Sequence, residues 1–162
     1  MVSHRHKKRE AKPLVVTFCG HTDWYGTSTE ISQLHSVIRQ LILEGADTFF
    51  LGGYGRFDDC AAATVRDLKA EFPNIRSLLV IPYPDREYCK NLYDGSLFPP
   101  IEKTPPRFAI SKRNEWMIGQ ADVVVSGVNR DWGGAYAALR YAKRKKKRIV
   151  YIGKNALRFS VF

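Results

Sequence analysis

The segment LVVTFCGHT, residues 14–22, decides the fold class of this chain. Its first six residues form a nearly unbroken apolar run rich in β-branched side chains, which is typical of a strand buried on both faces. Gly20 ends the run. Behind it, Thr27 and Glu30 have the spacing of a helix capping box, and Gly45 supplies the stop signal of that helix. A buried strand followed by an amphipathic helix is the building unit of a parallel sheet.

Four more short apolar runs follow at 48–51, 77–81, 122–126 and 148–152, and segments of helical periodicity separate most of them. Strands that alternate with helices predict a parallel sheet covered on both faces. Right-handed crossovers then give a Rossmann-like, doubly wound α/β fold. We expect about five strands in the order 3-2-1-4-5, within a single domain that spans residues 13–162.

Cap residues indicate where three further helices begin. Asp58 or Asp59 can cap the helix after the second strand, a serine can cap the helix 111–120, and the glycine pair 133–134 opens the last helix. The stretch 83–107, rich in Pro, Tyr and Asp, has no clear periodicity. A loop of this length in a compact domain is typically functional or mobile.

The composition excludes several classes of protein. The chain has 162 residues, 44% apolar and 26% charged, which fits a globular core and excludes global disorder. No apolar run approaches the roughly 18 residues of a membrane span, and the polar start is unlike a secretory signal, so no membrane partner is expected. Cys19, Cys60 and Cys89 lack the spacing of a disulfide framework or a zinc site. We therefore expect reduced thiols, no metal and a cytoplasmic location.

The formal net charge of +10 is concentrated in two segments. Residues 4–12 carry +4 and residues 143–148 carry +6, so the rest of the chain is close to neutral. A nucleic-acid surface usually spreads its cations over one face among aromatic rings. The charge pattern therefore favours a flexible basic tail at 1–12 and a solvated helix end at 143–148, which suits the helix dipole. Nucleic-acid binding through 143–148 stays as an alternative, and residues 153–162 could dock on a second subunit to form a homo-oligomer.

In a doubly wound sheet, ligands bind at the carboxyl ends of the strands, near the point where the strand order reverses. The loops after the first, second and fourth strands and the start of the third helix are expected there. Glycines let a backbone approach an anion, and helix N-termini present free N–H groups with a positive dipole. The candidate ligand-binding residues are Gly20, His21, Thr22, Gly52, Gly53, Gly55, Arg56, Asp58, Arg113, Asn114, Asp131, Trp132, Gly133 and Gly134.

Side-chain chemistry suggests a role for each kind of residue. Arg56 and Arg113 could make bidentate contacts to phosphate, and Asp58 and Asp131 could accept hydrogen bonds from ribose hydroxyls. The rings that could stack on a base are Trp132, Tyr54 and Tyr83. Structural alternatives stay open, since Asp58 could be only a helix cap and Arg113 could only snorkel over the edge of the core. The convergence of four segments on one sheet edge favours a site for a nucleotide or nucleotide-derived ligand.

The common nucleotide-binding motifs are absent from the sequence. There is no GxxxxGK[ST] loop and no GxGxxG fingerprint, and no acidic residue ends the second strand to bind a dinucleotide ribose. The chain also lacks a serine nucleophile elbow. No resident cofactor is expected.

Three motifs carry a resemblance to a known family: VVTFCGHT (15–22), LGGYGRFDDCAA (51–62) and the segment 113–152, with Arg-x-x-x-Met, Ala-Asp, Gly-Gly and Arg-Tyr-Ala-Lys in sequence. On these motifs the chain resembles the SLOG superfamily, which unites the Lonely Guy phosphoribohydrolases, the DNA-processing protein DprA and the YpsA/YoqJ-like proteins. The resemblance is greatest to the last group, small bacterial and prophage proteins, and covers residues 14–152. It implies a Rossmann-like fold that binds a nucleotide or an ADP-ribose-like ligand at the strand ends.

The resemblance extends only partly to catalysis. Lonely Guy enzymes cleave the base–ribose bond of nucleoside monophosphates with an Arg and a Glu, and their Arg-x-x-x-Met segment matches Arg113 and Met117. Their motif Pro-Gly-Gly-x-Gly-Thr-x-x-Glu does not match, because no Glu follows 133–134 in the first helical turn. Such cleavage needs a carboxylate to stabilise oxocarbenium-like charge, and Asp131 and Asp58 are the candidates. The sequence favours a binding protein or sensor, with a nucleotide N-glycosidase and a DprA-like nucleic-acid binder as alternatives.

Overall fold

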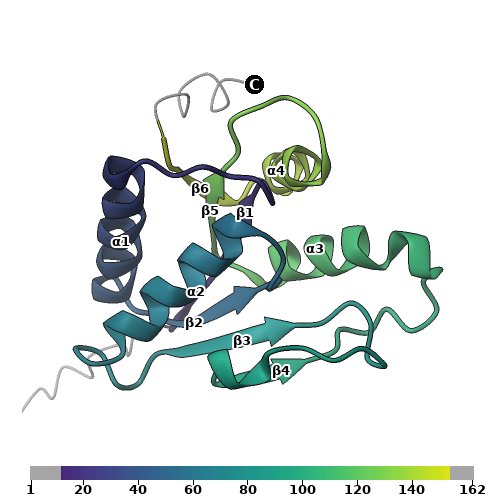
Figure 1. Ribbon diagram of the computed structural model, residues 1–162, viewed down its shortest axis with the longest axis horizontal. Helices are drawn as coiled ribbons and strands as arrows, with labels where there is room; N and C mark the ends of the chain where they lie inside the picture. The colour runs from purple at the N-terminus through teal and green to yellow at the C-terminus, as the bar shows by residue number, and fades with distance from the viewer. Residues whose placement is uncertain (1–11, 154–162) are drawn as a thin grey trace, which may run out of the picture.

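A computed structural model describes residues 12–153. Its strands form one parallel sheet in the order β4-β3-β2-β1-β5-β6 (Figure 1). The strands are β1 (Leu14–Gly20), β2 (Ala46–Leu51), β3 (Arg76–Val80), β4 (Gly95–Leu97), β5 (Val123–Gly127) and β6 (Arg148–Tyr151). The helices are α1 (Ser28–Leu43), α2 (Arg56–Leu68), α3 (Ala109–Gln120) and α4 (Gly134–Arg144), with two short 3-10 helices, η1 (Lys90–Leu92) and η2 (Pro106–Phe108).

The predicted doubly wound α/β fold class is confirmed, and the sheet has one strand more than expected. The five predicted strands lie in the predicted order, and β4 pairs with β3 at the edge, from within the stretch 83–107. Asp94 holds β4 in place: its carboxylate accepts a 2.8 Å hydrogen bond from the backbone N–H of Ser77 and pairs with Lys69. A three-residue strand that begins with glycine has no apolar run, so periodicity could not reveal it.

Helices cover both faces of the sheet (Figure 1). α1 and α2 pack on one face, where Leu34, Phe49 and Phe57 are fully buried in the larger core. α3 and α4 pack on the other face, over a second core that includes Ile118 and Leu139. Burial of the central strands on both faces explains their continuous apolar runs.

The helix starts agree only in part with the prediction. Thr27 caps α1 as predicted, since its hydroxyl accepts a 3.2 Å hydrogen bond from the N–H of Glu30. The N-cap of α2 is a glycine, so neither Asp58 nor Asp59 has the predicted capping position. α3 begins two residues before Ser111, because the proline-containing turn η2 leads directly into it.

The basic segment 143–148 lies at the end of α4 and the start of β6, at the sheet edge opposite to the strand carboxyl ends. Lys147 donates to two backbone carbonyl groups at the end of α3, at 3.2 and 2.9 Å. Arg148 forms a 2.6 Å ion pair with Glu44. The segment is therefore not simply the solvated helix end that its charge suggested.

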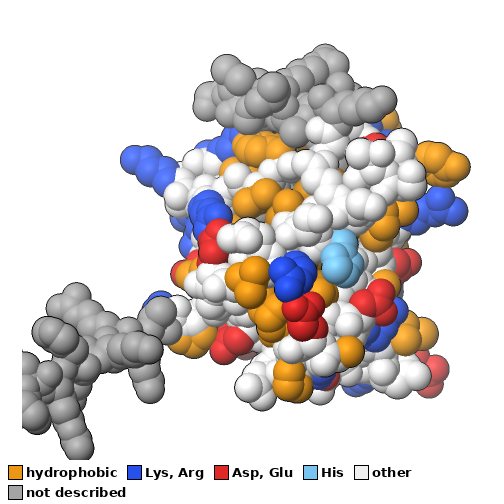
Figure 2. Space-filling model, turned by 90° about the vertical axis from the view of Figure 1, so that its left-hand side faces the viewer, with side chains coloured by type: hydrophobic (Ala, Val, Ile, Leu, Met, Phe, Trp, Pro, Cys, Tyr) orange, Lys and Arg blue, Asp and Glu red, His pale blue; other side chains and the backbone are white. Residues whose placement is uncertain are grey.

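The face of the molecule that α1 covers is not strongly cationic (Figure 2). On the side that α1 covers, Lys and Arg side chains are interspersed with acidic and apolar ones (Figure 2). Within the described residues, no helix has the length and apolar character that crossing a membrane requires. The expected basic tail, apart from Lys12, and the expected docking segment beyond Gly153 lie outside the described residues.

Candidate functional site

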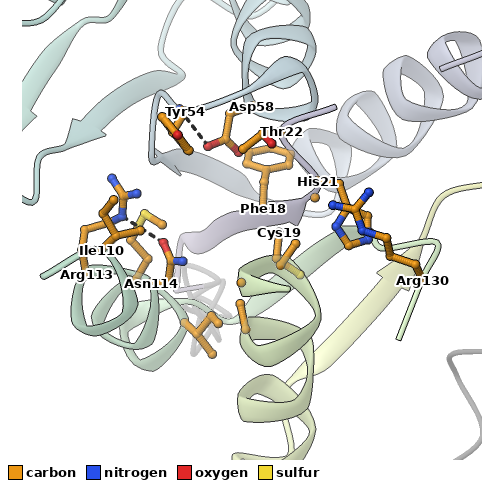
Figure 3. Close-up of a pocket in the computed structure, with 16 residues that line it drawn as sticks. Phe18, Cys19, His21, Thr22, Tyr54, Asp58, Ile110, Arg113, Asn114 and Arg130 are labelled. Carbon is orange, nitrogen blue, oxygen red and sulfur yellow. Dashed lines mark hydrogen bonds between the residues drawn. The ribbon is translucent and has the colours of Figure 1, made fainter. Parts of the chain in front are cut away.

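A pocket of about 190 Å³ opens at the carboxyl ends of β1 and β5, where the strand order reverses (Figure 3). The loop after β1, the start of α2, one face of α3 and the first turns of α4 surround it. The predicted residues that line it are Gly20, His21, Thr22, Asp58, Arg113, Asn114 and Gly134. The predicted residues that do not line it are Gly52, Gly53, Gly55, Arg56, Asp131, Trp132 and Gly133.

Contacts from α2 and from the loop after β5 fix the loop after β1. Trp24 is 4% exposed and packs edge-on against Phe57, with a centroid distance of 5.2 Å. The first backbone N–H of α2 donates to the carbonyl of Thr22 at 3.0 Å. Asp23 accepts hydrogen bonds of 2.9 and 3.0 Å from the guanidinium of Arg130, which follows β5. The loops after β1 and β5 are therefore tied together beside the pocket.

Two buried side-chain nitrogens on one side of the pocket have no hydrogen-bond partner among the described residues: Nε2 of His21 and Nε of Arg130. They lie near each other, across the pocket from Arg113 (Figure 3). A buried polar group without a partner costs about 1–3 kcal/mol, so native structures rarely keep one without a reason. An acceptor group of a bound ligand would satisfy Nε of Arg130 and, in the tautomer that carries its proton on Nε2, the ring of His21 as well.

The electrostatics of His21 also favour an anion. Burial, followed by the charge of Arg130, lowers the pKa of His21 from its usual value of 6.5, although Asp23 acts in the opposite direction. The imidazole is therefore neutral at pH 7. A negatively charged ligand beside the ring would offset the effects that lower its pKa.

Arg130 was not among the predicted ligand-binding residues, whereas the neighbouring Asp131 and Trp132 were. Asp131 and Trp132 are exposed and do not line the pocket, and the ring of Trp132 instead lies 3.9 Å from the guanidinium of Arg130. The available signal was a cation between a buried strand and the glycine pair 133–134. Nothing in the sequence distinguishes an inward-facing position from an outward-facing one in such an irregular loop.

Arg113 has a structural role that limits its use as a phosphate clamp. The side chain is 2% exposed, and Nη1 donates to the carbonyls of Gly52 and Val80 at 2.9 and 2.8 Å. Its Nε donates to the side-chain oxygen of Asn114 at 2.9 Å. Arg113 thus joins the ends of β2 and β3 to α3 and is buried, so it does not snorkel over the edge of the core, while its bidentate contact to phosphate stays a prediction.

Asp58 is the one carboxylic acid that lines the pocket. Burial raises its pKa to about 6, although the charge of Arg113 and a 3.3 Å hydrogen bond from the backbone N–H of Tyr54 act to lower it. Burial also raises the pKa of the Cys19 thiol to about 12, so this thiol is not a nucleophile at neutral pH. Within residues 12–153, no three His, Cys, Asp or Glu side chains gather closely enough to hold a metal ion.

Most of the glycines at the site serve packing and not the approach of a ligand. A Cβ at Gly20 would lie 2.1 Å from the ring of Phe57. At Gly55, where φ is 95°, a Cβ would lie 2.4 Å from the backbone of Thr22. Gly134 differs, because it lines the pocket and a Cβ there would meet nothing within 4 Å. Of the glycines predicted to let the backbone approach an anion, Gly134 at the start of α4 is therefore the one that lines the pocket and leaves space beside it.

Comparison with known proteins gives structural but not sequence relatives. No protein-family model and no curated protein matches the chain. DNA processing protein A (DprA) from Helicobacter pylori, described by its single-stranded DNA binding mode, is 21% identical with a TM-score of 0.59 over 86% of this chain. The molybdenum cofactor carrier protein from Chlamydomonas reinhardtii is 15% identical with a TM-score of 0.57 over 86% of this chain. The molybdenum cofactor binding protein from Rippkaea orientalis is 15% identical with a TM-score of 0.59 over 87%.

These likenesses show the fold alone, because all the identities are low. The chain spans 65% of the H. pylori DprA chain and 76% and 77% of the two cofactor-binding proteins. Their folds agree with the Rossmann-like architecture that the resemblance seen in the sequence implies. The neighbours bind different partners, so the fold does not specify the ligand.

Proposed function

We propose that this protein binds a nucleotide or nucleotide-derived ligand, with a phosphate group held where His21, Arg130 and the first turn of α4 meet. The two buried nitrogens without partners carry this proposal. Their position supports it, since doubly wound sheets bind ligands where the strand order reverses. Binding of small ligands or nucleic acid by proteins of this fold is consistent with it.

A phosphate at this point would meet three kinds of donor. The N–H of Ala137 makes the first intrahelical hydrogen bond of α4, 3.0 Å to the carbonyl of Gly133. The N–H groups of Gly134 and Ala135, both in the pocket lining, precede it and have no intrahelical partner. They present the positive end of the helix dipole to an anion. Arg130, whose Nη1 is already paired with Asp23, adds the N–H of its Nε, and the imidazole of His21 adds a further hydrogen bond.

The opposite side of the pocket suits a nucleoside. Asn114 retains its amide N–H groups for a ligand, because its oxygen already accepts from Arg113. Ile110 and Met117 offer apolar contacts. Tyr54 is 62% exposed at the rim, where its ring could stack on a base. The predicted base-stacking role therefore falls to Tyr54 and not to Trp132.

Within the SLOG-type fold, we propose the YpsA/YoqJ-like group, on the three motifs that carry the resemblance. We propose a binding protein and not an efficient hydrolase, because α4 begins without a carboxylate and Asp131 does not line the pocket. Asp58 supports a second candidate, a nucleotide N-glycosidase, because a pocket carboxyl with a pKa near 6 can stabilise developing positive charge. Nucleic-acid binding through 143–148 has less support, since Lys147 and Arg148 already have partners.

Calorimetric titration with AMP tests the proposal. We expect AMP binding by the wild type and a loss of about 10–100-fold in affinity in Arg130→Gln, the range for one charged hydrogen bond. Arg56→Gln is the matched control, because Arg56 is exposed and outside the pocket, and it should stay within about twofold of the wild type. Absence of AMP binding, or an equal effect of the two variants, would contradict the proposed site.

Chromatography of the same AMP incubations separates binding from catalysis. We expect no free adenine above the rate without protein. Turnover that disappears in Asp58→Asn but persists in Asp131→Asn would establish the glycosidase instead, with Asp58 as its carboxylate.

A further inference from the structure

A second cavity, of about 410 Å³, lies between α3 and α4 and shares part of its lining with the pocket. The shared residues are Ile110, Asn114, Gly134 and Ala138. We refer to this second cavity as the α3–α4 groove. Small-molecule sites typically enclose about 300–1,000 Å³, so the pocket alone is small for a nucleotide. The groove provides the adjacent space into which such a ligand would extend.

The α3–α4 groove has an excess of positive charge. Arg107 at η2 and Arg140 and Arg144 on α4 line it. None of the three forms an ion pair with a carboxylate in the described part of the chain. Glu115 is the one acid in the lining, and it pairs with Lys112 at 3.2 Å. The charge of the groove is therefore left for a ligand to balance.

The two arginines of α4 are held in position by aromatic rings. The guanidinium of Arg140 lies 5.9 Å from the ring centroid of Tyr136, and that of Arg144 lies 5.6 Å from the ring centroid of Tyr141. The arginines are four residues apart, so they lie on the same face of the helix. Contact with a ring reduces the freedom that each side chain loses when it binds an anion.

The spacing along α4 sets the length of the ligand. Arg140 lies six residues after Gly134, which is about 9 Å along the helix axis at 1.5 Å per residue. An arginine side chain can extend back over part of this length. A phosphate one nucleoside away from the start of α4 would therefore lie nearest to Arg140, and Arg144, one turn further on, would extend back along the helix to reach it.

We propose that the ligand carries a second phosphate group, one nucleoside away from the first, and that Arg140 and Arg144 bind it in the α3–α4 groove. This inference rests on the proposed function of the pocket. The ligand class is then a small molecule built on a nucleoside 3′,5′-bisphosphate, and neither a simple mononucleotide nor a nucleic acid. The start of α4 binds the first phosphate of the ligand, and the arginines of the groove bind the second.

The test compares AMP with adenosine 3′,5′-bisphosphate by calorimetric titration of the full chain. We expect the wild type to bind the bisphosphate at least about tenfold more tightly than AMP, as one added charged contact would give. The double variant Arg140→Gln/Arg144→Gln should lose this preference and keep the AMP affinity. The control Lys145→Gln/Lys146→Gln removes the same charge from residues outside the groove and should keep the preference.

Each other outcome overturns the inference in a recognisable way. Equal affinity of the wild type for the two probes, or equal weakening of both probes in the arginine double variant, overturns the second phosphate site but leaves the proposed function. Binding of neither probe overturns the proposed function as well. A single-stranded 12-mer that binds more than about tenfold tighter than the bisphosphate, and that weakens in the arginine double variant, shows a nucleic-acid groove and overturns the small-ligand assignment.

Discussion

A bound ligand would change both the charge and the hydrogen bonding of His21. Its ring is 3% exposed and near Arg130, and both conditions favour the neutral imidazole. Its Nε2 nevertheless has no hydrogen-bond partner in the described structure. A phosphate beside Nε2 would supply an acceptor and a negative charge together. The proton on His21 therefore reports directly on the occupant of the pocket.

We expect the pKa of His21 to lie below 6.5 in the free protein and to rise when AMP saturates the pocket, because the anion favours the imidazolium. NMR titration of the imidazole signals with and without AMP measures this directly. The signals of His35 on α1, which does not line the pocket, serve as the internal control. An unchanged or lowered pKa of His21 at saturation would mean that the phosphate binds elsewhere.

Asp58 predicts how stability depends on pH. Its folded-state pKa of about 6 lies above its unfolded value near 3.9, so the folded state binds this proton more tightly. The stability that this proton provides is complete below about pH 4 and is lost as pH rises through about 6, up to about 3 kcal/mol in all. Asp58→Asn cannot ionise and keeps an acceptor for the N–H of Tyr54.

We therefore expect the free energy of unfolding of Asp58→Asn to fall less than that of the wild type between pH 5 and pH 8, measured by urea denaturation. Asp131→Asn, at an exposed position outside the pocket, should show the wild-type slope. A destabilisation by Asp58→Asn that is larger at pH 8 than at pH 5 would show instead that the ionised carboxylate of Asp58 stabilises the fold beside the charge of Arg113, and that its pKa is not raised.

Among the elements, α4 presents its first turn to the pocket. Gly134 is the first residue of the helix, and a Cβ there would enter open space. We expect Gly134→Val to lower AMP affinity by at least about tenfold, because its side chain would occupy the phosphate position, while the melting temperature changes little. Calorimetry and thermal unfolding measure the two effects.

Gly119→Val is the matched control for this element. Gly119 lies in α3, and a Cβ there also meets nothing within 4 Å, but the residue does not line the pocket. This variant should keep its affinity for AMP. Wild-type AMP affinity in Gly134→Val would place the phosphate away from α4, and a large loss of its stability would indicate that the glycine serves only the turn.

The elements were predictable from sequence where periodicity or caps define them. The apolar runs identified the central strands because burial on both faces leaves no polar alternation, and Thr27 identified the start of α1. The edge strand β4 was not predictable, because its pairing depends on a tertiary contact, the hydrogen bond from the backbone N–H of Ser77 to the carboxylate of Asp94. The helix α3 begins two residues before the predicted cap Ser111, because the 3-10 helix η2 leads directly into it.

The site was predictable only as a location. The topology brings the loops after β1 and β5 together, so the sheet edge followed from the strand order. The direction of each side chain in an irregular loop depends on tertiary contacts, such as Asp23 with Arg130, and these have no local pattern. The sequence therefore indicated loops that meet at the pocket, but two of its predicted ligands, Arg56 for phosphate and Asp131 for ribose, do not line that pocket.

At the scale of the whole molecule, the fold limits where a ligand binds but not which ligand it is. DprA and the molybdenum cofactor carriers share this architecture at low identity and bind unlike partners. The chemistry lies in a few side chains at one sheet edge. In this chain we propose that those side chains are His21 and Arg130, together with the start of α4, and that the arginines of the α3–α4 groove extend the same surface.

A crystal structure of the full chain soaked or co-crystallised with AMP tests the proposed site most directly. We expect the phosphate within hydrogen-bond distance of the N–H groups of Gly134 and Ala135, of Nε2 of His21 and of the guanidinium of Arg130. The adenosine should lie toward Asn114. A phosphate bound at another surface, or a pocket that stays empty at an AMP concentration that saturates binding in solution, would contradict the proposed function.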